Sequence, residues 1–417
     1  MTYLVRTVDH ELDGLILGAP AIALDGPKGV GKTDTASRRA AQTWQLDDPD
    51  QRERLRSDFA LGSVAPHGTV LFDEWQRLPQ VWDSVRRQVD RGAPPGRFLL
   101  TGSATPTDSL GTHSGAGRIM SLRMRPMGLH ERGLTQPSVS LSGLLAGTSD
   151  VVSGDTTFTL TNYVDAIVSS GFPATVSLTA PQRHAFLRAY VARIIDRDLS
   201  ELGIAVRKPD TLLRWLRAYA AATATTTAYS RLLDAATAGD GAQPAKTTTT
   251  AYRDQLAQLW LLDTLPGWLP SHSAFTQLRQ APKHHLADPA LAAQLLGQSA
   301  STLLSPRGAS LTGQLFESLV TLGVRVAAQA ADATVSHLRT KAGEREIDLI
   351  VEGFDGRILA IEVKLASSVN DADVRHLVWL RDQLPDAVVD TVVVTTGSAA
   401  YRRSDGVAVV PLALLGP

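Results

Sequence analysis

The chain has 417 residues, of which 43% are hydrophobic, 20% charged and 6% aromatic, and its formal net charge is −1. This length predicts two to four domains, the composition excludes a mainly disordered chain, and the balanced charge means that any contact with nucleic acid must come from a local basic patch. The lack of cysteine excludes disulfides, cysteine zinc sites and a thiol nucleophile. Because we also find no signal peptide or membrane-spanning run, we expect a cytoplasmic protein without membrane contact.

The first 133 residues alternate short apolar strands with helices. We expect strands over residues 19–24, 69–72, 98–100 and 119–123, and helices over residues 34–44 and 81–89. This alternation is typical of an α/β domain with a parallel sheet.

The residues after the first strand match a phosphate-binding loop along their whole length. They are Gly26, Pro27, Lys28, Gly29, Val30, Gly31, Lys32 and Thr33, which fit G-x-x-x-x-G-K-[ST] between a strand and a helix. In such a loop the backbone amides surround the phosphates of ATP, Lys32 reaches the β- and γ-phosphates, and Thr33 ligates Mg²⁺. The alternative is a glycine-rich turn without a ligand, which the flanking strand and helix do not favour.

An acidic pair ends the second of these strands. We expect Asp73 to hold Mg²⁺ through water, and Glu74 to polarise the attacking water as a general base. Acidic pairs at strand ends are often merely solvated, but the preceding loop favours the catalytic interpretation.

Together these residues resemble the AAA-type branch of the P-loop ATPases. The resemblance implies a polar sensor at the end of the next strand, where Thr101 is the candidate and Ser103 the second choice. It also implies an arginine finger before the fifth strand, where Arg118 stands, and therefore a homo-oligomer. An uninvolved hydroxyl and an ordinary surface arginine are the alternatives.

The middle of the chain predicts mainly helices. Residues 134–205 are expected to be a helical lid or linker, with a boundary or exposed loops over 134–155 and a long helix over 181–199. Within 206–275, the phrase TTTAY occurs at 225–229 and 248–252. Because threonine caps helix starts, both phrases are expected to open helices, with a strand over 259–265. This pattern indicates a winged helix-turn-helix that contacts DNA or packs against another domain.

Residues 276–417 predict a second α/β domain. The expected elements are helices over 311–324 and 371–384 and strands over 347–351, 358–363 and 388–395, with a tail from residue 412. Asp348 lies on one strand, and Glu362 and Lys364 lie on the next. Because side chains alternate along a strand, Glu362 and Lys364 share a face and can meet Asp348. Such a group can bind one or two divalent cations and act on a phosphodiester.

This second group resembles the PD-(D/E)xK phosphodiesterase superfamily, which implies a further acid on the preceding helix, Glu317, as a metal ligand. The whole chain resembles a prokaryotic family in which an AAA-type ATPase carries a C-terminal domain of unknown function with a nuclease-like fold. Further residues that carry this resemblance are 171–173, 197–198 and 282–288.

The resemblance implies no substrate, so three interpretations of the C-terminal domain stay open: an active nuclease, a DNA-binding module that does not cleave, and a protein-interaction domain. The leading hypothesis is a Mg²⁺-dependent ATPase that acts on DNA. The main alternative is a signalling switch that holds a protein partner, and a third is a chaperone-like remodeller. His284 and His285 are expected to be solvated or packed, with contact to a phosphate as the alternative. Trp260 and Trp268 are expected to be core or interface anchors, with base stacking as the alternative.

Overall fold

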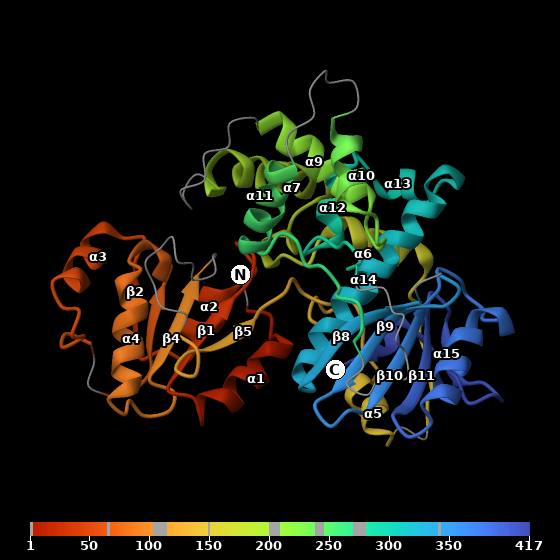
Figure 1. The fold of residues 1–417 in the computed structure, drawn as a ribbon, viewed down its shortest axis with the longest axis horizontal. Helices are drawn as coiled ribbons and strands as arrows, with labels where there is room; N and C mark the ends of the chain where they lie inside the picture. The colour runs from red at the N-terminus through yellow and green to blue at the C-terminus, as the bar shows by residue number, and fades with distance from the viewer. Residues whose placement is uncertain are drawn as a thin grey trace. The chain divides into compact units, whose positions relative to one another are not determined.

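The computed structural model of the protein describes residues 3–64, 67–102, 115–148, 151–199, 209–237, 246–269, 281–340 and 343–417. By their internal contacts these residues divide into two compact units. The N-terminal unit comprises Met1–Pro126 with Leu256–Leu261, and the C-terminal unit comprises Met127–Gln255 with Leu262–Pro417. Each unit is built on its own sheet (Figure 1). The expected division into 1–133, 134–205, 206–275 and 276–417 stays a prediction.

The sheet of the N-terminal unit has five strands, and every strand is parallel to its neighbours. In the order of the sheet they are β2 (Gln42–Gln45), β3 (Val70–Asp73), β4 (Phe98–Gly102), β1 (Ala21–Asp25) and β5 (Met120–Arg123). The strands β1, β3 and β4 are buried along their whole length, as expected when both faces of a parallel sheet are covered. This confirms the predicted α/β fold with a parallel sheet.

Among the described residues of this unit, four helices and a 3₁₀ turn accompany the sheet. They are α1 (Thr7–Ile16), α2 (Lys32–Ser37), α3 (Pro49–Arg56), η1 (Trp75–Arg77) and α4 (Gln80–Asp90). Helix α4 buries Val81, Trp82 and Val85 at helical spacing. The ring of Trp82 lies 4.8 Å from that of Trp75, centroid to centroid, in the same core. This packing fixes the turn that directly follows the acidic pair.

The expected helix over residues 34–44 is wrong in its second half. Helix α2 ends at Ser37, and the following residues form the edge strand β2. The amide of Ala41 donates to the carbonyl of Thr69 at 2.8 Å, and Trp44 is buried in the core. Tertiary packing of the tryptophan on the sheet therefore overrides the high intrinsic helix propensity of the alanines.

The C-terminal unit is built on a mixed sheet of seven strands. In the order of the sheet they are β7 (Gly154–Asp155), β12 (Ala399–Arg402), β13 (Ala408–Pro411), β11 (Val388–Thr395), β10 (Ile358–Val363), β9 (Glu346–Gly353) and β8 (Ala333–Arg339). Strand β9 is antiparallel to both of its neighbours, β8 and β10, whereas β10, β11 and β13 are parallel. The predicted strands over 347–351, 358–363 and 388–395 are β9, β10 and β11, which confirms a C-terminal α/β domain.

Two predicted helices flank this sheet. Helix α14 (Ala309–Ala330) leads into β8, and α15 (Asp371–Gln383) connects β10 to β11 (Figure 1). Helix α15 packs on the sheet with Val374, Leu377 and Leu380. Both helices therefore have the places that the sequence predicts for them.

Two segments expected to be peripheral are part of the same unit. Residues 134–155 contain β6 (Val139–Ser140), α5 (Leu141–Ala146) and β7, and the expected tail forms η6 (Leu412–Leu414) and β14 (Leu415–Gly416). Strand β14 pairs with β6, and Ser140 Oγ donates to the carbonyl of Pro417 at 2.8 Å. The expectation of exposed loops is therefore only partly right, since residues 139–146 form β6 and α5, and the expected tail is paired with β6.

The remaining helices of the described residues lie between β7 and α14 in sequence. They are α6 (Leu160–Ser169), η3 (Pro173–Thr175), α7 (Ala180–Arg193), η4 (Ile194–Asp198), α9 (Pro209–Ala221), α10 (Tyr229–Ala236), α11 (Lys246–Gln258), α12 (Pro289–Leu295), α13 (Ala300–Leu303) and η5 (Pro306–Gly308). Helix α12 contacts α6, α7, α9 and α14. The helix predicted over 181–199 is α7, which the π-helical turn η4 continues.

The predicted winged helix-turn-helix is reproduced only in part. The first TTTAY phrase ends where α10 begins, but the second lies inside α11 and opens no helix. The strand expected over 259–265 is reduced to isolated antiparallel bridges, Leu262 with Leu286 and Leu265 with Lys283. The winged-helix assignment therefore stays a prediction.

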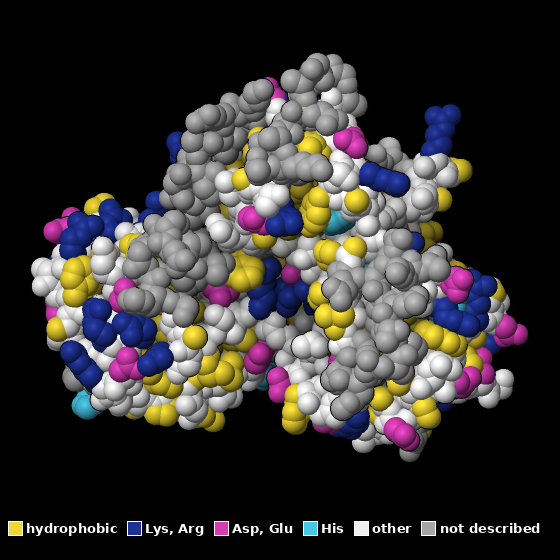
Figure 2. Space-filling view, in the orientation of Figure 1, with side chains coloured by type: hydrophobic (Ala, Val, Ile, Leu, Met, Phe, Trp, Pro, Cys, Tyr) yellow, Lys and Arg dark blue, Asp and Glu magenta, His cyan; other side chains and the backbone are white. Residues whose placement is uncertain are grey.

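The face drawn in Figure 2 shows no dominant charge. On the face drawn in Figure 2, basic side chains form several separate groups among acidic and uncharged ones, which agrees with the near-zero net charge. Within the described ranges, no helix is both long enough and apolar enough to cross a membrane.

Candidate functional site

The carboxyl ends of the parallel strands bring the predicted N-terminal site residues together. In the sheet register Asp73 of β3 is paired with Thr101 of β4, and Asp25 of β1 is paired with Gly102. The loop of residues 26–31 directly follows β1 at the same edge. In open α/β sheets this edge is where ligands bind.

Glycine is required at two positions of the loop. A Cβ on Gly26 would lie 2.2 Å from the carbonyl oxygen of Met124, so no side chain fits there. Gly31 has a φ of 106°, in the left-handed region that favours glycine. The loop is also held by Arg6, which is 3% exposed and whose guanidinium donates to the carbonyl of Val30 at 3.0 Å. The sequence gives no signal for Arg6, because it lies outside the motif.

Lys32 is buried beneath the loop. Its Nζ donates to the carbonyl oxygens of Gly26 at 2.8 Å and of Pro27 at 2.9 Å. Burial lowers its pKa to about 8, and the carboxylates of Glu74 and Asp25 oppose this effect. The ammonium is therefore held at the loop, where it can exchange carbonyl oxygens for phosphate oxygens.

Asp73 is the meeting point of two hydroxyl groups. Thr33 Oγ1 donates to Asp73 Oδ1 at 2.8 Å, and Thr101 Oγ1 donates to the same oxygen. Thr101 is 1% exposed. The expected contact of Thr101 with a γ-phosphate stays a prediction, since its hydroxyl is here directed at Asp73; the second choice, Ser103, lies outside the described residues.

Glu74 lies next to Asp73 in a backbone conformation that is uncommon for a residue with a side chain. Its φ of 53° and ψ of 45° are left-handed, and such geometry is concentrated at functional sites. Burial raises its pKa, and the ammonium of Lys32 opposes this effect. The amide of Gln76 donates to Glu74 Oε2, a contact that the sequence motif did not indicate.

Asp25 is a further buried carboxylate at this edge that the sequence analysis missed. It is 4% exposed, and its Oδ1 has no hydrogen-bond partner. Burial raises its pKa to about 6, although a hydrogen bond from Ser121 and the charges of Arg123 and Lys32 act in the opposite direction. An acidic residue that ends a fully apolar strand was the available signal.

The side chains at this edge suit a nucleotide with Mg²⁺. The hydroxyl of Thr33 and the carboxylate of Asp73 are hard oxygen donors, which is the chemistry that Mg²⁺ prefers. The glycine conformations keep side chains out of the loop, and Lys32 supplies a cation. The residues present therefore fit both groups.

Arg118 lies on the surface, directly before β5. Its Nε is 2.9 Å from Asp90 Oδ1, and 46% of its side chain is exposed. Ion pairs at this exposure are weak, so the guanidinium can exchange its partner. The role as a finger stays a prediction.

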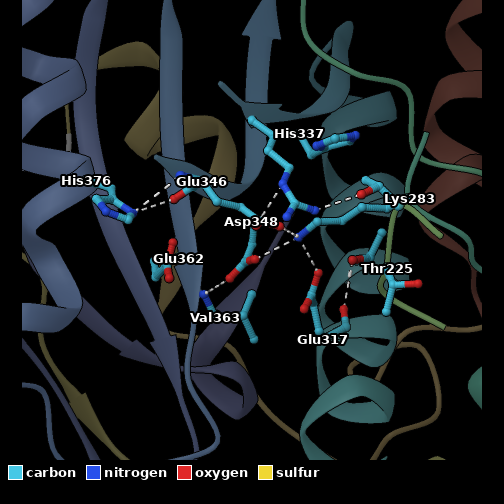
Figure 3. Close-up of polar contacts among 12 residues, drawn as sticks. Thr225, Lys283, Glu317, His337, Glu346, Asp348, Glu362, Val363 and His376 are labelled. Atoms are coloured by element: carbon cyan, nitrogen blue, oxygen red, sulfur yellow. Dashed lines mark hydrogen bonds and ion pairs between the residues drawn. The ribbon is translucent and has the colours of Figure 1, made fainter. Parts of the chain in front are cut away.

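The C-terminal unit places Asp348 and Glu362 on the neighbouring strands β9 and β10 (Figure 3), and Lys364 directly follows β10. Asp348 lies on β9, and its Oδ2 accepts a hydrogen bond from the amide of Val363, which follows Glu362 on β10, at 2.9 Å. Lys364 Nζ donates to Glu362 Oε1 at 2.8 Å. Glu362 Oε2 is buried without a hydrogen-bond partner.

The dominant feature of this cluster is Lys283, a residue to which the sequence motifs assign no role. Lys283 is 1% exposed, and its Nζ lies 2.8 Å from Glu317 Oε1, 2.8 Å from Asp348 Oδ1 and 3.3 Å from Glu346 Oε1 (Figure 3). Burial alone lowers the pKa of this lysine, but the surrounding carboxylates raise it above its usual value. For the same reasons burial raises the pKa of Glu317 and Glu362, whereas Lys283 lowers that of Asp348 despite burial. Within the described ranges, no group of three or more His, Asp or Glu side chains is arranged to hold a metal ion.

The residues beside Lys283 are packing residues, as predicted. The ring of His284 lies 4.8 Å from that of Tyr219, and burial lowers the pKa of His285 to about 3. Trp268 is 3% exposed, and its Nε1 donates to Glu352 at 2.8 Å. Asp288, at the end of the same phrase, accepts hydrogen bonds from Ser170 Oγ at 2.8 Å and from the amide of Gly171 at 2.7 Å. Asp288 therefore links the segment 282–288, to which it belongs, to the segment 171–173.

Three family models match successive parts of the chain. Residues 18–132 match an AAA domain, residues 160–302 match a domain of unknown function (DUF8612), and residues 312–415 match another domain of unknown function (DUF4143). The AAA match contains the phosphate-binding loop and both predicted acids. The DUF4143 match contains Glu317, Asp348, Glu362 and Lys364.

Similar proteins and structures are also found. The uncharacterized proteins Rv2008c of Mycobacterium tuberculosis and Mb2031c of Mycobacterium bovis are each 28% identical over 408 residues, which cover 94% of this chain and 80% of each relative. A Walker-type ATPase of Pyrococcus abyssi covers 69% of this chain and 94% of its own, with 16% identity and a TM-score of 0.42. The ORC2 protein of Aeropyrum pernix covers 72% and 92%, with 15% identity and a TM-score of 0.28. The N-terminal part of the chain is therefore similar to an AAA domain over residues 18–132, which contain the phosphate-binding loop.

Proposed function

We propose that the chain binds ATP with Mg²⁺ at the carboxyl edge of the N-terminal sheet and hydrolyses it to ADP and phosphate. The observation that carries this proposal is the contact of Thr33 with Asp73 at 2.8 Å, because it joins the phosphate-binding loop to the acidic pair. Mg²⁺, when bound by these oxygens, neutralises phosphate charge. The loop amides and Lys32 would hold the β- and γ-phosphates.

Glu74 would act as the general base. A water molecule attacks the γ-phosphorus, the bond from that phosphorus to the β,γ-bridging oxygen breaks, and Glu74 accepts the proton that the water releases. Its raised pKa makes the carboxylate a better proton acceptor than an ordinary glutamate. Gln76 would hold this carboxylate through the hydrogen bond to Oε2.

The test is nucleotide affinity and turnover in the full chain. Lys32→Ala should lose ATP binding, because the ammonium is one of the groups that neutralise the phosphates. Lys28→Ala is a matched control in the same loop, since Lys28 is not the lysine of the motif. Undiminished ATP affinity of Lys32→Ala would overturn the assignment of the loop.

We further propose that Arg118 acts as a finger on the nucleotide of a second copy of this chain. Its exposed guanidinium, held by a surface ion pair with Asp90 and by a hydrogen bond to the carbonyl of Ala116, is available to a neighbouring subunit. The proposal requires a homo-oligomer, in which turnover depends on protein concentration.

For the C-terminal unit we propose an ATP-driven module that acts on DNA, with the nuclease-like resemblance as the reason. The placement of Asp348 and Glu362 on adjoining strands, with Lys364 directly after the second, supports that resemblance. A divalent cation would lie between Asp348 and Glu362, whose Oε2 is unpartnered. The exposed arginines of the middle helices, Arg214, Arg217 and Arg231, would contact phosphates in a winged-helix module.

The alternative is a switch that holds a protein partner, with a silent nuclease-like domain. Turnover with and without DNA, with supercoiled plasmid followed in the same tube, separates these functions. Stimulation by DNA with cleavage indicates a nuclease, and stimulation without cleavage indicates a DNA-binding module. The absence of both favours the protein switch.

A further inference from the structure

The cluster around Lys283 already contains a cation. The ammonium has three N–H donors, and three carboxylate oxygens lie within 3.3 Å of it, on Glu317, Asp348 and Glu346. At 1% exposure the lysine has no access to water in place of these partners. An isolated charge at this depth is very unfavourable, so each partner depends on the others.

The backbone fixes the lysine in this place. Lys283 exchanges two backbone hydrogen bonds with Leu265, at 2.9 and 3.0 Å, so its Cα cannot shift without breaking an antiparallel pair. Glu317 comes from helix α14, and Asp348 comes from β9. The backbone at Lys283 therefore holds the ammonium between helix α14, which carries Glu317, and strand β9, which carries Asp348 (Figure 3).

The two sides of the cluster differ in whether their carboxylate oxygens have hydrogen-bond partners. On the Glu317 side, Asp348 Oδ1 and Glu317 Oε1 are both satisfied by the ammonium of Lys283. On the Glu362 side, Glu362 Oε2 is unpartnered although the residue is only 9% exposed. A carboxylate pair can hold one cation at a position, whether that cation is an ammonium or a metal ion.

We propose that Lys283 is the resident cation of the Glu317–Asp348 position and excludes a divalent cation from it. The cluster then holds at most one divalent cation, on the Asp348–Glu362 side, and the role of Glu317 is to bind Lys283. A site with at most one divalent cation cannot use an in-line displacement mechanism that requires two metal ions. The inference concerns the Glu317 side alone and holds whether or not the other side takes a metal.

The test counts Mn²⁺ ions bound per chain. The nucleotide-free full chain with Asp73→Ala, which removes the candidate metal ligand of the N-terminal unit, is titrated with Mn²⁺ while free Mn²⁺ is followed by electron paramagnetic resonance. This parent and its Glu317→Gln variant should bind the same number of ions, because Glu317 holds Lys283 and no metal. The Lys283→Met variant should bind one ion more, and Lys283→Met with Glu317→Gln should lose that ion again.

Lys364→Met is the matched control, since it removes a lysine from the same cluster without vacating the Glu317 side. It should give no additional ion that depends on Glu317. If Lys283→Met folds only when Mn²⁺ is present, the metal has replaced the ammonium, which supports the inference.

Two results would overturn the inference: fewer ions bound by Glu317→Gln than by the parent, or no additional ion in a folded Lys283→Met. The Glu317→Gln comparison decides the question even where Lys283→Met does not fold at all. A parent that binds no Mn²⁺ would instead refute the cation proposed between Asp348 and Glu362, and would leave the inference on Lys283 standing.

Discussion

Replacing Asp25 by asparagine should stabilise the N-terminal unit at neutral pH. The carboxyl group is 4% exposed, and burial raises its pKa from 3.8 to about 6. A carboxyl whose pKa is higher in the folded state favours folding below its unfolded pKa, and this contribution is lost as the pH rises through the folded pKa. The native unit is therefore expected to lose stability between about pH 4 and pH 6.

The pKa shift sets the magnitude. One unit corresponds to about 1.4 kcal/mol, so a shift of roughly two units gives about 3 kcal/mol above pH 7. At pH 4.5, less than one pH unit above the unfolded pKa, the burial of Asp25 costs only about 1 kcal/mol of stability. The stability difference between Asp25→Asn and wild type should thus grow by about 2 kcal/mol from pH 4.5 to pH 7.5. Any effect of the asparagine that does not depend on pH cancels in this comparison.

The measurement is native-state hydrogen exchange in urea on peptides that cover β1 and β4, in the nucleotide-free chain at both pH values. These peptides report the N-terminal unit separately from the C-terminal one. Asp47→Asn is a control for loss of an exposed carboxylate and should show no such growth. If the stability difference of Asp25→Asn is the same at both pH values, burial of Asp25 does not control this linkage and the reasoning fails.

Three further predictions concern turnover. Glu74→Gln should bind ATP and turn it over about 10²–10⁴-fold more slowly than wild type. In wild type, kcat should fall on acidification at a higher pH than an ordinary glutamate would give, because burial raises the pKa of Glu74. Equal turnover of Glu74→Gln and wild type would show that Glu74 is not the base. Thr101→Val should reduce Mg²⁺-dependent turnover by an amount that corresponds to about 1.5–3 kcal/mol. Thr101→Ser keeps the hydroxyl that donates to Asp73 and should therefore retain wild-type turnover. Similar rates for the two variants would show that this hydrogen bond does not contribute to the reaction. Arg118→Ala should lose about 10³–10⁵-fold in turnover of the assembled protein, and mixing it with Glu74→Gln should restore part of the activity; no recovery between subunits that exchange would leave Arg118 an ordinary surface residue.

The candidate nucleotide site could be predicted because its residues are close together in the chain. Residues 26–33 follow an apolar strand without interruption, and Asp73 and Glu74 end another one. When strands are short, apolar and separated by helices, a parallel sheet follows, and its carboxyl edge then collects the loop and the acids. The sequence alone therefore determined the α/β fold of this unit and the place of the site within it.

The partners of these residues were decided by the tertiary structure. The hydroxyl of Thr101 is directed at Asp73 because β3 and β4 are paired in register, and the edge strand β2 replaces half of an expected helix because Trp44 packs into the core. Asp348, Glu362 and Lys364 were found from strand alternation, since they lie on adjacent segments of the chain. Lys283 could not be found in this way: it is 34 positions from Glu317 and 65 from Asp348, and a lone lysine in sequence carries no sign of burial. Only the packing of the 281–286 segment between α14 and β9 brings its ammonium to the carboxylates, where low exposure makes their charges depend on one another.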